Sequence, residues 1–322
     1  MAESEQRKLI RFGNSSYVIA IPKGWIDKNK LKKGDSLFVE ETSKNELVLS
    51  TKLAKESEIK SISLNLDNLD PKDFERDLIS AYMNNYSEIN IIGKNLKQKY
   101  NMIAKSIQEK VGLEISEEND NQITAKDILD LEAISLDKTV RRLDNMLRSM
   151  FEEILEGAKS GKIKDWTLKE IENTELGINK FYFLSWKIIR KCQDDPRVLQ
   201  KFKLDSRGIS NIQWVVLHLE YIGDELKRLA KILHKKGIPN QKEFIPVLEK
   251  IEEGYISMIG SFYSNDIMSA RNLAANKKSK IEMCEKILDT APAESPEGAE
   301  SVVEKLKSIY GFVHSISRVI GY

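Results

Sequence analysis

The chain has 322 residues, of which 41% are hydrophobic and 31% are charged, and its formal net charge is +1. This length exceeds one small domain and predicts two or three. Every apolar run is far shorter than the roughly 20 residues of a membrane-spanning helix, so the sequence argues against membrane insertion and we expect a cytoplasmic protein.

The first distinctive stretch, residues 7–33, is strongly basic. It contains eight Lys or Arg residues and one acid, a local balance of +7. Such an excess beside turn residues is expected of a nucleic-acid contact surface. From charge alone, an ordinary solvent-exposed basic face is an equally good interpretation.

The same stretch and the residues after it predict short strands and turns. Residues 7–11 are basic, and the Gly-Asn-Ser-Ser sequence at 13–16 predicts a turn. The β-branched and aromatic residues that follow predict a strand with at least one buried face. The complete order is a strand at 17–21, a short helix at 24–30, a turn at Gly34-Asp35, and strands at 36–40 and 46–50 joined through 43–45.

This order resembles the AbrB/SpoVT (MazE-like) swapped-hairpin DNA-binding domain. The resemblance implies a homodimer in which two copies interleave their hairpins, and so short a segment cannot bury a core without a partner chain. Asn14-Ser15 departs from the family, which often has a second basic residue after the glycine. The matching residues are the basic first strand, Gly13, Ile21-Pro22-Lys23, Gly34-Asp35 and Leu47-Val48-Leu49.

The resemblance also implies a DNA-binding surface on the N-terminal domain. Its predicted contacts are Arg7, Lys8, Arg11 and Lys23. Two-fold pairing would present this cluster twice along a duplex. Arg can donate two parallel hydrogen bonds to phosphate or guanine, whereas Lys is a point charge. We therefore expect Arg11 to contribute to sequence specificity and Lys23 to position the domain on the DNA backbone.

A charged connector at 52–60 leads to a region whose pattern changes. Residues 59–131 predict a small α+β domain with no Gly-rich phosphate loop and no carboxylate pair beside a histidine, so we interpret it as a spacer or dimerisation module. The predicted elements are a strand at 61–66, a helix at 73–84, a strand at 89–92, a helix at 96–111 and a hairpin of 113–117 with 122–125.

From residue 132 onward the apolar residues repeat every three or four positions, which predicts a mostly helical chain. Short links favour antiparallel bundles, divided three plus three into repeats at about 132–237 and 238–322. Cys192 and Cys284 lie in these patterns and are interpreted as core thiols. The six predicted helices are 134–159, 166–193, 206–234, 242–263, 265–289 and 298–320, with the last break at 292–296.

Residues 217–232 resemble a PhoU helix, whose pattern is Leu-Glu-Arg-Ile-Gly-Asp. Tyr221 replaces the arginine, and the preceding helix has Glu175 with Asn179 in place of an aspartate. As a whole the chain resembles archaeal-type phosphate uptake regulators, which join an AbrB-like reader to a PhoU-like helical domain. The resemblance implies a multidomain, mostly α fold: a swapped-hairpin β domain at 1–58, an α+β domain at 59–131, and a PhoU-like pair of three-helix bundles at 132–322.

Glu220 and Asp224 are spaced i, i+4, which places both carboxylates on one helix face. With Glu175 from the preceding helix, they predict one site for a divalent or ferric metal ion, as the PhoU resemblance implies. The alternative is ion pairing with Lys227, Arg228 or other basic neighbours. The histidines at 218, 234 and 314 stand singly and are interpreted as packing or surface residues.

The sequence as a whole predicts a dimeric, DNA-binding transcription regulator of phosphate homeostasis, whose helical part senses a ligand or partner. No nucleophile elbow, P-loop or metalloprotease helix is present, so we expect no enzyme, and metal-assisted hydrolysis at Glu220 and Asp224 is the weakest interpretation. The rival is a protein-binding adaptor that docks on a phosphate transporter subunit or its ATPase without binding DNA.

Overall fold

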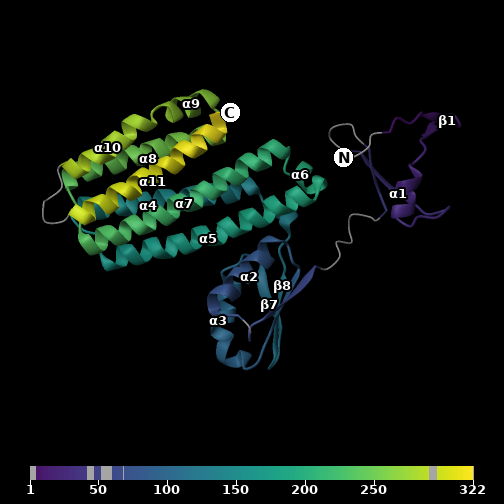
Figure 1. Ribbon diagram of the computed structural model, residues 1–322, viewed down its shortest axis with the longest axis horizontal. Coiled ribbons are helices and arrows are strands. Elements are labelled where there is room, and N and C mark those ends of the chain that lie inside the picture. Colours follow the sequence, from purple (N-terminus) through teal and green to yellow (C-terminus); the bar gives the residue numbers. More distant parts are fainter. Residues whose placement is uncertain (1–4, 42–46, 52–59, 68, 290–295, 322) are drawn as a thin grey trace. The chain divides into compact units, whose positions relative to one another are not determined.

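The computed structural model describes residues 5–41, 47–51, 60–67, 69–289 and 296–321 (Figure 1). The chain divides into two compact units, Met1–Glu58 and Ile59–Tyr322. The turn predicted at 43–45, the connector at 52–59 and most of the break predicted at 292–296 lie outside the described residues.

In its described residues, the first unit has one short helix between two antiparallel hairpins, as the sequence predicted. The strand predicted at 17–21 is shorter and starts one residue earlier. Gly13 makes the first turn with φ +73°, a conformation that suits glycine. The elements are β1 (Ile10–Phe12), β2 (Ser16–Val18), α1 (Lys23–Lys28), β3 (Phe38–Glu41) and β4 (Leu47–Ser50).

The second unit begins with a four-stranded sheet of order β5-β6-β8-β7, in which only the β5–β6 pair is parallel. Figure 1 shows α2 and α3 on the same side of this sheet. Phe74 and Leu78 of α2 pack with Ile89 and Ile91 of the sheet in one fully buried cluster. The elements are β5 (Ser61–Asn65), α2 (Pro71–Met83), β6 (Glu88–Ile92), α3 (Leu96–Gln108), β7 (Leu113–Glu118) and β8 (Gln122–Asp127).

The rest of the second unit is helical, with two corrections to the sequence prediction. The single helix predicted at 265–289 is two helices, one ending just before Asn276 and the next starting just after it. The Lys-rich residues 277–280 therefore form the start of α10 and do not lie in the middle of a helix. A short unpredicted helix begins at Pro196, where Asp195 accepts a hydrogen bond from the Arg197 amide. After a 3₁₀ turn (Leu131–Ala133), the helices are α4 (Leu136–Lys159), α5 (Asp165–Asp194), α6 (Pro196–Lys201), α7 (Ser206–Lys236), α8 (Gln241–Ser264), α9 (Ile267–Ala275), α10 (Lys277–Asp289) and α11 (Pro296–Gly321).

The two predicted helical repeats share one core. Leu147 and Leu219 from the first repeat belong to the same buried cluster as Ile251 and Leu306 from the second. α11 packs along α7, as Figure 1 also shows. Burial of this continuous apolar surface is the main source of stability expected for the helical region.

A buried polar contact joins the α+β layer to α5, and no sequence pattern predicted it. Lys187 is fully buried, its Nζ lies 2.8 Å from Asp127 Oδ2, and it donates to the Tyr82 carbonyl at 3.2 Å. Burial lowers the pKa of Lys187, while Asp127 favours the charged form. A largely buried ion pair therefore fixes the α+β layer against α5.

Both cysteines are buried, which confirms their interpretation as core thiols. Burial raises the pKa of each thiol to about 11, so neither is a reactive thiolate at neutral pH. Within the described residues, no helix combines the length and apolar character required to cross a bilayer.

Candidate nucleic-acid interface and helical acidic cluster

The β1–β2 hairpin separates its side chains into two faces. Ile10 pairs with Val18 and Arg11 with Tyr17. Because directly paired residues share a face and successive residues alternate, Arg11 and Tyr17 lie on one face. Ile10, Val18 and Phe12 lie on the opposite face together with Ser16, so that face is mostly apolar.

This apolar face is uncovered in the single chain. Ile10 is 59% exposed, Phe12 70% and Val18 42%. Indeed, no described residue of the first unit is buried. A contiguous exposed apolar surface on so small a unit favours burial against another protein chain.

The Gly34-Asp35 motif has a structural role in the turn after α1. Gly34 adopts φ +99°, which favours glycine. The Asp35 carboxylate accepts a hydrogen bond from the Lys32 amide at 2.7 Å, and the Asp35 amide donates to the Lys32 carbonyl at 3.0 Å. This turn redirects the chain from α1 toward β3.

All four predicted DNA contacts are exposed. Arg7 pairs with nearby Glu5, whereas no described side chain pairs with Lys8, Arg11 or Lys23. The hairpin register adds a residue that sequence reasoning missed. Tyr17, assigned from its β-forming neighbours to a buried strand, lies opposite Arg11 on the basic face and is 66% exposed.

The predicted acidic cluster lies between α5 and α7, and a lysine enters it. The Glu175 carboxylate is buried, accepts from Asn179 Nδ2 at 2.7 Å, and lies 2.7 Å from Lys227 Nζ. The same ammonium is 3.0 Å from Asp224 Oδ1. Lys227 therefore bridges two of the three carboxylates that were predicted to hold metal.

A second cation completes the pairing on α7. Arg228 is 2.8 Å from Asp224 Oδ2 and also contacts Glu225. These contacts match the ion-pair alternative for Asp224. A metal ion at Glu175, Glu220 and Asp224 would have to displace Lys227, so the residues as placed do not fit one, and no trio of His, Cys, Asp or Glu in the described chain is arranged as a metal site. The metal assignment stays a prediction.

Glu220 differs from its neighbours because no hydrogen bond or ion pair to it is present in the described residues. Burial is the main cause that raises the pKa of Glu220, the nearby carboxylates of Asp224 and Glu175 add to the increase, and the resulting pKa is about 7. Glu220 is thus poised to change charge near neutral pH.

The three histidines make separate local contacts, in keeping with their interpretation as packing or surface residues. His218 packs among Trp214, Tyr221 and Phe312. His234 Nδ1 lies 2.9 Å from the Ile163 carbonyl, and His314 Nε2 lies 3.1 Å from the Ala274 carbonyl.

Comparison with known proteins identifies the N-terminal region only. Residues 10–57 match the family described as "Antidote-toxin recognition MazE, bacterial antitoxin". No curated protein and no solved structure matches the chain. The chain thus has a MazE/AbrB-like N-terminal domain followed by an α+β layer and a long helical region, for which the comparisons do not identify PhoU.

Proposed function

We propose that this protein is a dimeric, DNA-binding regulator of phosphate uptake that acts without catalysis of its own. The MazE-type match at 10–57 supports DNA binding by the N-terminal domain. The resemblance of residues 217–232 to a PhoU helix supports the role in phosphate regulation, with the helical region as the part that senses a ligand or partner.

The observation that carries the proposal is the division of the β1–β2 hairpin into a basic and an apolar face. Two copies that cover each other's apolar faces bury Ile10, Phe12 and Val18. The two-fold axis then gives the dimer two symmetry-related copies of Arg11, both outside the buried apolar interface. Symmetric pairs of cations of this kind meet phosphates on successive turns of a duplex.

Regulation follows from linkage between the two units. A ligand that binds one arrangement of the helices more tightly shifts the population toward that arrangement. If the two arrangements place the DNA-binding ends of the dimer differently, the ligand changes DNA affinity, and DNA changes ligand affinity by the same factor.

The test is binding of the full chain to mixed-sequence duplex DNA across a salt series, measured by fluorescence anisotropy. We expect the logarithm of affinity to fall with the logarithm of salt by about 0.9 for each phosphate engaged. The Arg11→Ala, Lys23→Ala double variant should lose both affinity and slope. Lys235 and Lys250 of the helical region are exposed, so their double alanine variant removes equal charge and serves as the matched control.

Salt-independent or absent binding by the wild type would contradict the proposal and favour the adaptor. One observation supports that alternative: on α7, Trp214 is 52% exposed and Tyr221 is 40% exposed, and the Tyr221 ring lies against Phe312 of α11. Exposed aromatic groups of this kind are enriched at protein interfaces. Co-purification with a phosphate transporter subunit, together with no DNA affinity, would establish the adaptor.

A further inference from the structure

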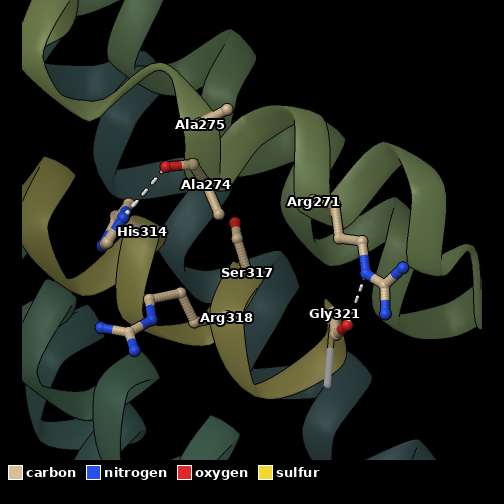
Figure 2. Close-up of a pocket in the computed structure, with 7 residues that line it drawn as sticks. All are labelled: Arg271, Ala274, Ala275, His314, Ser317, Arg318 and Gly321. Atoms are coloured by element: carbon tan, nitrogen blue, oxygen red, sulfur yellow. Dashed lines mark hydrogen bonds between the residues drawn. The ribbon is translucent and has the colours of Figure 1, made fainter.

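Two cavities of the helical region differ in how far their polar groups are already bonded. In the larger one, of about 430 Å³ between α9 and α11, Arg271 Nε donates to the Gly321 carbonyl at 2.8 Å, and His314 Nε2 lies 3.1 Å from the Ala274 carbonyl (Figure 2). Figure 2 also shows the Arg271 and Arg318 side chains pointing away from each other. These bonded groups join α9 to α11, and the two arginines do not converge on one point.

The smaller cavity, of about 200 Å³, lies where α4 ends and α5 begins. At roughly 30 Å³ per water molecule, this space suits a ligand of only a few heavy atoms. The link between the helices folds closely against α4 here, because a Cβ on Gly157 would lie 2.4 Å from Ile163 Cδ1. The cavity belongs neither to the predicted DNA surface nor to the acidic cluster on α5 and α7.

The α4 side of the cavity contributes two carboxylates, Glu153 and Glu156. Glu153 Oε1 accepts from Ser149 Oγ at 3.3 Å, whereas Oε2 is buried and has no hydrogen-bond partner among the residues described. Burial raises the pKa of Glu153, and neighbouring carboxylates such as Glu170 add to the increase. A bound cation would supply the missing donor and offset the repulsion between these carboxylates.

The α5 side of the cavity contributes hydrogen-bond donors. α5 has no side-chain cap, and its first backbone hydrogen bond is from the Leu168 amide to the Lys164 carbonyl, so the amides of residues 165–167 have no partner in the described chain. Thr167 lines the cavity, is only 5% exposed, and makes no hydrogen bond through its hydroxyl to any residue that the structure describes. Lys162 and Lys164 add positive charge to the same wall. An uncapped helix N-terminus with a buried, unbonded hydroxyl favours an anionic group.

The two sides together suit a molecule that carries both an ammonium and a carboxylate. An ammonium group only donates hydrogen bonds and a carboxylate only accepts them. The α4 side offers acceptors to the first, and the α5 side offers donors to the second. Asp165, the acid in the first turn of α5, is exposed near His234 and does not line the cavity.

We propose that this cavity binds a small zwitterionic amino acid, with its ammonium group on Glu153 and Glu156 and its carboxylate on the N-terminal amides of α5 and the Thr167 hydroxyl. The site is a binding activity separate from DNA binding and from phosphate regulation. It therefore holds or fails independently of the proposed function.

The test is isothermal titration calorimetry on the full chain at neutral pH and constant ionic strength, with glycine and, separately, L-alanine. We expect at least one of them to bind. Methylammonium and acetate each carry one of the two charged groups, and each should bind at least about tenfold more weakly because one side of the cavity stays unbonded. This series uses the unaltered chain, so it does not depend on how any variant folds.

Two variants of unchanged shape identify the contacts. Glu153→Gln removes the charge and Thr167→Val the hydroxyl, and we expect affinity to fall by about tenfold or more and by about threefold or more, respectively. Glu282→Gln makes the same change on α10 at a side chain that is 58% exposed. Thr139→Val does so for a buried threonine whose hydroxyl donates to the Ser135 carbonyl at 3.0 Å. Both controls should change affinity by less than about twofold.

Trp166 offers a second readout, because it lines the cavity and is 62% exposed. Its fluorescence should change on addition of the amino acid that binds, and Trp166→Phe should remove that change. Absence of binding by both amino acids would overturn the site. So would equal binding by the wild type, Glu153→Gln and Thr167→Val, or binding of methylammonium or acetate as tight as that of the amino acid.

Discussion

The two units of this protein place their apolar side chains in opposite ways. In the first unit, Ile10, Phe12 and Val18 are exposed and no described residue is buried. In the second, residues such as Phe151 and Leu219 belong to a continuous core that spans both helical repeats. Burial of apolar surface is the dominant favourable term in folding, so the second unit has the means to fold as one chain, whereas the first requires a partner.

This difference separates two kinds of sequence signal. An alternating strand pattern such as 17–21 predicts a buried face, and it does not say whether the cover comes from the same chain or from another one. A helical pattern repeated over six segments can cover its own faces. The exposed hairpin is therefore evidence for association, and the prediction of a homodimer is tested by charging its apolar face.

The largest effect is expected from Phe12→Asp. If the apolar face is buried in a dimer, symmetry places an unpaired carboxylate in the interface twice, at several kcal/mol each, which weakens association by more than about 10⁴-fold. DNA binding should be lost with the dimer. Concentration-dependent sedimentation of the full chain measures this. Tyr17→Asp adds the same charge to the opposite face and should remain dimeric, and an intact Phe12→Asp dimer would show that another surface holds the chains together.

The next effect is expected in the core of the second unit. Phe151 is fully buried, with its ring 5.5 Å from that of Tyr255, so Phe151→Ala leaves a cavity that costs about 3–5 kcal/mol. Scanning calorimetry should show a melting temperature for the helical region lowered by roughly 10 °C. Phe12→Ala removes the same group from the first unit and should leave this transition in place. Equal shifts of the melting temperature for the two variants would mean that the two units do not differ in how they bury their apolar side chains.

A smaller effect is expected where the α+β layer meets α5. Lys187→Ala leaves Asp127 without its ion pair at a site with little water, which should cost about 2–3 kcal/mol of unfolding free energy. Lys180, also on α5, donates to the Gln108 carbonyl at the surface, so Lys180→Ala should cost less than about 0.5 kcal/mol. Urea unfolding of both variants makes the comparison, and similar losses would mean that the buried pair contributes no more than a surface contact.

The sequence predicted most of the elements because their signals are local. Apolar spacing located helices such as α5 and α7, and the hairpin of β7 and β8 followed from its Asn-Asp-Asn turn. The break at Asn276 was missed because one asparagine does not interrupt an apolar period, although Asp195-Pro196 carried a readable helix start for α6.

The site was less predictable, because its contacts join residues far apart in the chain. Exposure of Arg11 follows from local pattern, but its pairing with Tyr17 depends on strand register. Lys227 was named as a partner for Asp224 on the same helix, and its bridge to Glu175 across helices was not. Lys187 and Asp127 are sixty residues apart, and neither carries a sequence signal for the other.

The smallest effect concerns Glu220 and its dependence on pH. Its pKa is raised to about 7 in the folded chain, so folding favours the protonated form. That stabilisation is complete below the unfolded value of about 4.5 and is lost as the pH rises through 7. Glu220→Gln keeps a neutral side chain, and it should therefore be more stable than the wild type at pH 8 by about 1–2 kcal/mol, after allowance for solvent screening, and similar to it at pH 5. Melting temperatures across this range measure the difference.

Glu172 provides a control, because its hydrogen bond to Lys231 lowers its pKa. Glu172→Gln should therefore be less stable than the wild type at pH values above the acid range, the opposite of the effect expected for Glu220→Gln. Parallel pH profiles for the wild type and Glu220→Gln would mean that folding does not shift the pKa of Glu220, and the acidic cluster would then not respond to pH near neutrality.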